Sequence, residues 1–198
     1  MSSPAAPSPV DPNNVMMTGE NSFIRYSPDG GKTQPDRASH WRVLWCPAGA
    51  GHALFMRSTL TGGEAKIWSD NPPVARWLQK EIESFLFPAF ADAATPVTPA
   101  AFTRSGGIDS RAAELVTAKD AEILLSWEDF LTPFVLNMPP GSANRPIGVF
   151  STFFPAKTAR ISLNGRVAAG TPYAEKRGER ESTSACLAWS ETWVKPAS

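Results

Sequence analysis

Short runs of apolar residues, many of them alternating with polar residues, dominate this chain. The runs are bounded by Gly, Pro, Asn or Asp, which is typical of β-strands with one or both faces buried. We expect about ten strands from this pattern. Their expected ranges are residues 23–26, 41–46, 52–58, 64–68, 101–104, 111–117, 121–130, 149–154, 158–168 and 184–194.

The joints between the expected strands are short. Asn164-Gly165 is a strong signal for a two-residue hairpin, because both residues tolerate positive φ, and it divides the range 158–168 into two strands. Short joints favour antiparallel neighbours, since a parallel crossover needs about a dozen residues or more. An open sheet of this size would leave long exposed edges. The sequence therefore predicts a mainly β fold, either an antiparallel barrel or a curved β-sandwich.

One segment has helical spacing instead. Asp70 and Asn71 supply cap residues before two prolines that favour a helix start, and Pro88 marks its end. The apolar stripe comprises Val74, Trp77, Leu78, Ile82, Phe85 and Leu86, and the polar face comprises Arg76, Lys80, Glu81 and Glu83. We predict an amphipathic helix of about 14 residues that lies against a sheet or plugs a barrel end.

The remaining segments complete the plan. Residues 1–18 are expected to form a disordered tail and residues 19–198 a single β-rich domain. The Pro-rich range 132–146 predicts a long irregular loop, and the mixed charge run 175–181 predicts a solvated hairpin tip. In architecture the plan resembles the lipocalin-like (calycin) barrels, although no Gly-x-Trp motif opens the first strand and the helix lies mid-chain.

Charge and cysteine content narrow the partners and the compartment. Nineteen basic residues balance nineteen acidic ones, so the chain lacks the field that collects nucleic acid or anionic membrane, and neither is expected as a partner. Cys46 and Cys186 each lie in an apolar run typical of a buried reduced thiol, with a disulfide between them as the alternative. We expect a cytoplasmic protein and allow for a homodimer.

Strong signatures of metal and cofactor enzymes are missing from the sequence. It has no Cys-x-x-Cys, His-x-His, His-Glu-x-x-His, Gly-x-Gly-x-x-Gly or Gly-x-Ser-x-Gly motif. We therefore expect neither a cofactor nor a metal ion. Any acid–base chemistry must use Glu, Asp, Tyr or one of the two histidines. His52 is a catalytic candidate, whereas His40 is expected at the surface at a strand start.

The seven tryptophans are the main hint of a binding site. We expect Trp45, Trp127 and Trp189 to line the interior of the barrel and to hold an apolar or aromatic ligand. Strict alternation places Trp189, Glu191 and Trp193 on one face, together with Leu187.

Carboxylates within apolar strands are the other candidates. An acid between two indoles is desolvated, which raises its pKa and suits proton transfer, so Glu191 is the first catalytic candidate. The alternative for Glu191 is a rim carboxylate paired with Arg160 or Arg166. Glu128 lies in the apolar range 121–130 and is a further acid–base candidate.

Arg57 and Tyr26 are candidate ligand-binding residues with structural alternatives. Arg57 lies in an apolar strand, where it must pair with a buried carboxylate (Glu114 or Glu128) or bind an anionic ligand. Either the Tyr26 hydroxyl orients a ligand, or Tyr26 is a half-buried structural residue that packs just before a turn.

Two functions of different classes remain open. The first is a small-molecule-binding barrel for an apolar or aromatic metabolite, with cofactor-free lyase or isomerase chemistry as an extension. The second is a non-catalytic protein-interaction or carbohydrate-binding β-sandwich, which a solid interior and solvent-facing Trp41 or Trp68 would favour.

Overall fold

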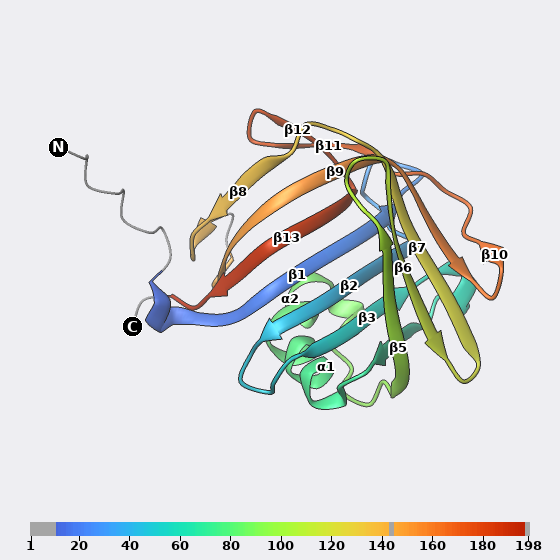
Figure 1. Ribbon diagram of the computed structural model, residues 1–198, viewed down its shortest axis with the longest axis horizontal. Helices are drawn as coiled ribbons and strands as arrows, with labels where there is room; N and C mark the ends of the chain where they lie inside the picture. The colour runs from blue at the N-terminus through green and yellow to red at the C-terminus, as the bar shows by residue number, and fades with distance from the viewer. Residues whose placement is uncertain (1–10, 143–144, 197–198) are drawn as a thin grey trace.

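The computed structural model of this protein describes residues 11–142 and 145–196, and they fold around one closed β-barrel (Figure 1). Within these residues nine strands follow one another around the barrel, and the last pairs with the first. In spatial order they are β9 (Gly148–Leu163), β13 (Ala185–Val194), β1 (Val15–Tyr26), β2 (Asp36–Trp45), β3 (Gly51–Arg57), β4 (Ala65–Ser69), β5 (Val97–Gly106), β6 (Arg111–Ala118) and β7 (Ala121–Phe130). The mainly β class and the barrel are as expected.

The long strand β9 closes the barrel. Its first half pairs with β13 as far as Pro155, and its second half pairs with β7 from Ala156 onward. Asn164 and Gly165 follow with positive φ and turn the chain into the short β10 (Arg166–Val167), which confirms the hairpin predicted at this dipeptide.

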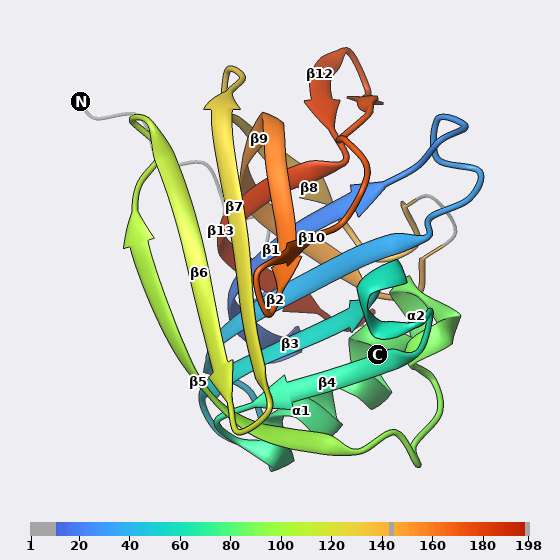
Figure 2. The ribbon, with the colours of Figure 1, turned by 90° about the vertical axis from the view of Figure 1, so that its right-hand side faces the viewer.

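The barrel is mixed, where antiparallel pairing alone was expected. Strands β4 and β5 run parallel, with Ile67 opposite Val97 and Ser69 opposite Pro99. The chain between them is the helical segment, which is long enough to carry β5 back to the starting end of β4. The helix therefore determines the direction of β5 as well as covering the barrel (Figure 2).

The helical segment lies on the outer surface of the barrel against β3 and β4. It consists of α1 (Pro72–Leu78), a π-helical turn at Gln79–Glu83, and α2 (Ser84–Leu86), so its expected start and end are confirmed. A π-turn inserts one extra residue and rotates the faces that follow it. Glu83, expected on the polar face, is therefore buried, and Phe85, expected on the apolar stripe, is 42% exposed.

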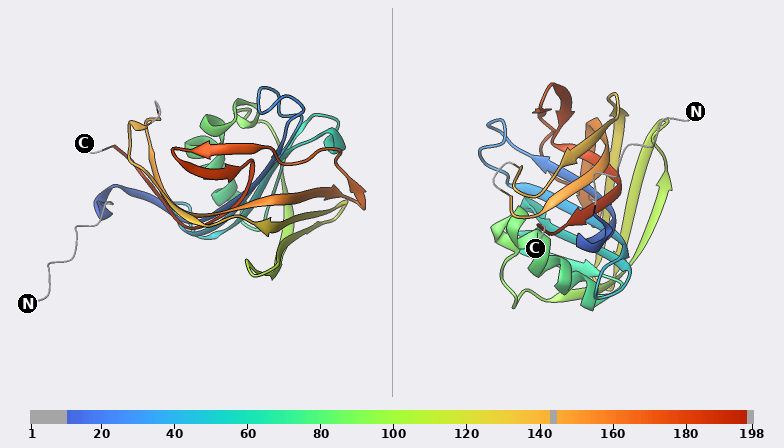
Figure 3. Two further views of the ribbon diagram at one scale, coloured as in Figure 1. Left: turned by 90° about the horizontal axis from the view of Figure 1, so that it is seen from above. Right: turned by 90° about the vertical axis from the view of Figure 1, so that its left-hand side faces the viewer.

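Three segments differ from or extend the expected plan. The range 132–146, expected as an irregular loop, contains strand β8 (Phe134–Met138), which pairs with β9. The run 175–181 forms the expected hairpin, from β11 (Ala174–Arg177) and β12 (Arg180–Thr183), and it projects from the barrel (Figure 3). Of the expected tail, residues 1–10 lie outside the described residues, whereas 11–18 form a 3-10 turn (Pro12–Asn14) and the start of β1.

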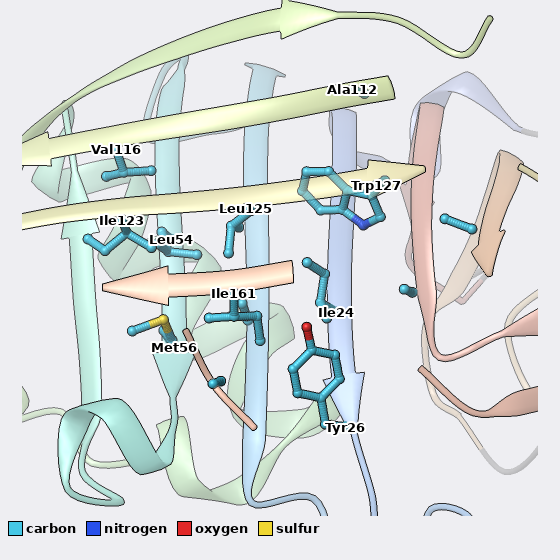
Figure 4. Close-up of a cluster of buried hydrophobic side chains, with 14 of the residues drawn as sticks. Ile24, Tyr26, Leu54, Met56, Ala112, Val116, Ile123, Leu125, Trp127 and Ile161 are labelled. Atoms are coloured by element: carbon cyan, nitrogen blue, oxygen red, sulfur yellow. The ribbon is translucent and has the colours of Figure 1, made fainter. Parts of the chain in front are cut away.

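The core has two main parts, one on each side of the barrel wall. The lumen is packed with apolar side chains from all around the barrel, among them Ile24, Leu54, Met56 and Trp127 (Figure 4). The outer part lies between the helical segment and β2, β3 and β4, and includes Trp41.

Candidate functional site

Buried polar atoms that lack a hydrogen-bond partner mark two places on the described part of the chain. In the lumen they are Ser22 Oγ, both ring nitrogens of His40, and Trp189 Nε1. On the outer side they are the Nε atoms of Arg25, Arg37 and Arg177, and Glu83 Oε2. An unpaired buried polar group costs about 1–3 kcal/mol, and we therefore take these two places as the candidate sites.

The outer site is a small cavity that we call the arginine pocket. It has a volume of about 100 Å³ and is partly open to solvent. Its polar lining comprises Asn21, Arg25, Arg37, Arg145, Arg177 and Glu191, and its apolar lining comprises Phe23, Leu86, Leu136, Met138, Val149, Phe153 and Trp193. Strands β1, β2, β8, β9, β11 and β13, helix α2 and the segment before β9 contribute these residues.

Positive charge accumulates in the arginine pocket. Arg25 and Arg177 share one carboxylate, Glu175, at 3.0 and 2.9 Å. Burial lowers the pKa of Arg145, and the neighbouring Arg177 and Arg25 lower it further. Burial also lowers the pKa of Arg37, against the attraction of Glu83. These guanidinium groups repel one another, and the pocket therefore favours an anion.

Glu191 lies in this pocket and is 3% exposed. Trp193 Nε1 donates a hydrogen bond of 2.9 Å to Glu191 Oε2. Burial raises the pKa of Glu191 to about 8, although the hydrogen bonds from Trp193 and Ser151 lower it. The carboxyl is therefore mostly protonated at neutral pH, and it does not cancel the charge of the arginines.

A β-bulge corrects the expected face of Glu191. Ser190 has a φ of 53°, and the pairing of β13 with β9 shifts between Trp189 and Thr192. One extra residue here sends Trp189 into the lumen, while Glu191 and Trp193 face outward. The expected desolvation of Glu191 is present, but one indole supplies it instead of two.

The second site, which we call the barrel mouth site, lies in the lumen near the turns that join β2 to β3 and β5 to β6. It comprises Glu20, Ser22, His40, Arg104, Glu114 and Trp189. Arg104 donates hydrogen bonds to Glu20 and, at 3.1 Å, to Glu114. Glu20 also accepts a bond from Arg42 at 3.4 Å. This ladder alternates in charge and joins β1 and β2 to β5 and β6 across the lumen.

His40 lies below the ladder and is 1% exposed, which corrects its expected position at the surface. Strand β2 begins at Asp36 instead of residue 41, so His40 is internal to the strand. Its Nε2 lies 3.7 Å from Glu114 Oε1, which exceeds a hydrogen bond. Burial, with Arg104, His52 and Arg42 nearby, holds the pKa of His40 well below its usual range. Burial likewise raises the pKa of Glu114, against the attraction of Arg104.

Three of the other expected site residues face the lumen. The His52 ring stacks on Phe102, and its Nδ1 lies 2.7 Å from Asp70 Oδ2. Trp127 is buried, and its Nε1 donates to the Phe23 carbonyl. The Tyr26 hydroxyl donates to the Ala159 carbonyl at 2.8 Å, so a backbone group already occupies it.

The other three lie away from both sites. Trp45 ends β2 and is 50% exposed, so it does not line the interior. Glu128 forms an exposed ion pair with Arg111 at 3.1 Å. Arg57 Nε donates to the Gly63 carbonyl at 2.8 Å, and the expected pairing with Glu114 or Glu128 is not formed, since these bind Arg104 and Arg111.

The sequence analysis does not identify Arg37, Arg145 and Arg177 as site residues. They lie on three separate segments and converge only because the β11–β12 hairpin and the segment before β9 fold over the outer wall. One feature of the sequence indicates the burial of Arg37: it lies just before the alternating run that contains Trp41.

Other searches give negative results. No described helix is long and apolar enough to cross a membrane. No group of three or more His, Cys, Asp or Glu side chains in the described ranges is arranged to hold a metal ion. Comparison with protein-family models, with curated proteins and with solved structures finds no match to this chain.

Proposed function

We propose that this protein binds a small molecule with an apolar, single-ring body and an anionic group, and that the arginine pocket is its site. The convergence of Arg25, Arg37, Arg145 and Arg177 on one cavity with a single ion-paired carboxylate carries this proposal. A guanidinium binds a carboxylate or phosphate through paired, charge-assisted hydrogen bonds. The unpartnered Nε atoms of three of these arginines are available as further donors.

The apolar lining supports the rest of the ligand description. Phe23, Phe153 and Trp193 supply aromatic surface beside the arginines, and β8 adds Leu136 and Met138. A volume of about 100 Å³ is below that of sites for drug-sized ligands and below the roughly 150 Å³ cavity that encloses one benzene ring, so a single-ring ligand with an anionic group would extend through the open side of the pocket. The proposed ligand therefore has the aromatic ring expected from the sequence and an anionic group in addition. Its proposed site is on the outer wall of the barrel instead of in the lumen.

Glu191 favours a second candidate function, cofactor-free lyase or isomerase chemistry. Its carboxyl lies in the same pocket as the arginines, and its pKa of about 8 is close to the working pH that suits a group which both gives and accepts protons. With the anionic group of the substrate held by the arginines, Glu191 would transfer a proton to or from a carbon of the bound molecule.

Binding is tested by calorimetric titration with phenylacetate and with its neutral analogue phenylacetamide. We expect the acid to bind and the amide to bind at least about tenfold more weakly, because a charge-assisted hydrogen bond contributes about 1.5–3 kcal/mol. Arg145→Gln should weaken phenylacetate binding by about the same factor. Arg166→Gln removes an exposed charge outside the pocket and should change nothing.

Equal affinity for acid and amide, or no binding of either, would show that the proposal is wrong. A melting temperature for each variant establishes that it is folded. Failure of binding would favour the protein-interaction function; the carbohydrate-binding variant has less support, because Trp41 and Trp68 are buried.

Proton transfer is tested with phenylpyruvate, which carries a ring, a carboxylate and an exchangeable C3 proton. In deuterated buffer above about pD 8 the ionised Glu191 would take the C3 proton and leave an enolate, exchange that proton for a deuteron from the solvent, and return the deuteron to C3. We expect the native chain to accelerate this exchange, as followed by NMR, and Glu191→Gln to lose the acceleration while still binding phenylacetate. Equal exchange rates with the native chain and with Glu191→Gln would remove the catalytic assignment.

The proposed location and class of partner are those expected from the sequence. Cys46 and Cys186 are both buried free thiols, which suits a reducing compartment such as the cytoplasm. A small molecule remains the proposed partner, in preference to nucleic acid or a membrane, because the charges of the whole chain balance.

A further inference from the structure

The barrel mouth site has unmet hydrogen-bonding capacity that the arginine pocket does not explain. Ser22 and His40 are paired across β1 and β2, and both side chains face the lumen. Ser22 Oγ, both His40 nitrogens and Trp189 Nε1 are buried without a partner in the described ranges. Each of these buried unpaired atoms calls for an explanation, and three of the four belong to the two rings of His40 and Trp189.

The charged residues around these atoms are partly exposed to solvent. The Arg42 side chain at the rim is 47% exposed, and the Arg104 and His52 side chains are 25% and 28% exposed. His40 and Glu114 lie below them and are almost fully buried. A molecule that displaces the Arg42–Glu20 contact, which is long at 3.4 Å, would reach His40 and Trp189.

Charge and shape define what this site would accept. Arg42, Glu20, Arg104 and Glu114 alternate in sign and leave no surplus charge for an ion. Flat side chains line the position: Phe102 lies 5.5 Å from the His40 ring, and Phe154 lies 5.0 Å from Trp189. Burial keeps the imidazole of His40 neutral, so it offers one donor and one acceptor, and Trp189 offers a donor.

We propose that the barrel mouth site is a second binding site, which takes a small, neutral, planar molecule that both donates and accepts hydrogen bonds, such as a cyclic amide or an amide-like heteroaromatic ring. His40 and Ser22 would bind its donor and acceptor, and Trp189 Nε1 would donate to its carbonyl. The site is separate from the arginine pocket, because the wall formed by β1, β2 and β13 lies between them.

Two histidines in the whole chain make a direct test practical. In protein labelled with ¹⁵N in its imidazole rings, only His40 and His52 give signals, and His52→Gln assigns them. We expect 2-pyridone to shift the His40 nitrogens in a saturable manner. Toluene, which has a similar size but no hydrogen-bonding group, should leave them unchanged.

Variants and a second ligand sharpen this result. Ser22→Ala and Trp189→Phe each remove one polar group and should weaken 2-pyridone binding about three- to tenfold, the effect of one neutral hydrogen bond. Phenylacetate should not shift the His40 nitrogens, so failure here and failure of the arginine pocket are distinguishable. If 2-pyridone leaves His40 unchanged, or acts no differently from toluene, the site holds ordered water only and the proposal is overturned.

Discussion

The two faces of the wall formed by β1, β2 and β13 differ in how they bury charge. On the lumen face, Glu20 and Glu114 each accept hydrogen bonds from Arg104, and the charges alternate along a ladder. On the outer face, Arg25 and Arg177 share Glu175, and the pKa of Arg145 is lowered by burial and, to a smaller extent, by repulsion from Arg177 and Arg25. The lumen charges compensate one another, whereas the outer face carries positive charge in excess of its one ion-paired carboxylate.

Each face combines exposed and buried charges: Arg42 on the lumen side is 47% exposed, whereas Arg37 on the outer side is 8% exposed. A buried charge without a partner destabilises a fold strongly, and a charge near solvent is stabilised by water. The arginine pocket is partly open, so its excess charge is tolerated in the free protein. The lumen carboxylates Glu20 and Glu114 are both paired with Arg104. We therefore base the proposed anion site on the surplus charge of the outer face, and the proposed site for a neutral molecule on the balanced charge of the lumen.

The largest expected effect is on stability, and it compares the removal of an indole inside the barrel with the removal of one at its surface. Trp127→Ala removes a side chain that is 1% exposed and should lower the free energy of unfolding by about 3–5 kcal/mol. Trp45→Ala, at a position that is 50% exposed, should change it by about 0.5 kcal/mol or less. Denaturant unfolding measures both. A small effect at Trp127 would show that the lumen is not a packed core.

The next effect tests the protonation of Glu191 on the outer face. Its pKa of about 8 in the folded chain lies above the ordinary value of 4.5, so the folded state holds one more proton than the unfolded state between these values. The free energy of unfolding should fall by about 1.4 kcal/mol per pH unit from this group as pH rises through that window.

Glu191→Gln should remove this contribution and still accept the Trp193 hydrogen bond through its amide oxygen. Relative to the native chain, we expect the variant to gain stability at pH 8 compared with pH 5, as followed by melting temperature. Parallel pH profiles for the two proteins would contradict the protonated state.

A pair of charge deletions compares the two faces directly. Glu114→Gln breaks a charged hydrogen bond to Arg104 and should cost about 1.5–3 kcal/mol of unfolding free energy. Arg145→Met keeps the apolar stem and relieves repulsion from Arg25 and Arg177. It should therefore lower the free energy of unfolding by no more than about 0.5 kcal/mol, or raise it. If Arg145→Met is the costlier change, the outer charges are structural.

The smallest effect concerns Tyr26, which lies in the lumen with its hydroxyl bonded to the Ala159 carbonyl. Tyr26→Phe should lower the free energy of unfolding by about 1 kcal/mol, as measured by denaturant unfolding, because it leaves that carbonyl unpaired. Binding of phenylacetate and of 2-pyridone should be unchanged. Loss of either ligand would return Tyr26 to the list of binding residues.

Local patterns in the sequence predict the elements of this fold well. The range 121–130 coincides with β7, the prolines at 72, 73 and 88 bracket the helical segment, and Asn164-Gly165 forms its turn. Each is determined by residues close together in the chain, through alternation, helix starts and positive φ. The parallel pairing of β4 and β5 depends on the path of the intervening helix, which such patterns do not specify.

The sites are less predictable because small irregularities move side chains to other faces. The π-turn at Gln79–Glu83 places Glu83 against Trp41, although ideal helical spacing assigns it to solvent. The bulge at Ser190 separates Trp189 from Glu191. Nothing in the local composition marks either irregularity. The arginines of the outer pocket come from distant segments, so only the closed barrel brings them together.

The bulge at Ser190 also makes the two sites depend on one register. Side chains alternate along a strand, so this one additional residue assigns Trp189 to the inner site and Glu191 to the outer one. Deleting Ser190 would turn Glu191 and Trp193 toward the lumen and would remove the acid from the arginine pocket. The backbone at this one position thus decides which side chains of β13 face the lumen and which face the arginine pocket. A change in the register of β13 would therefore alter both sites together.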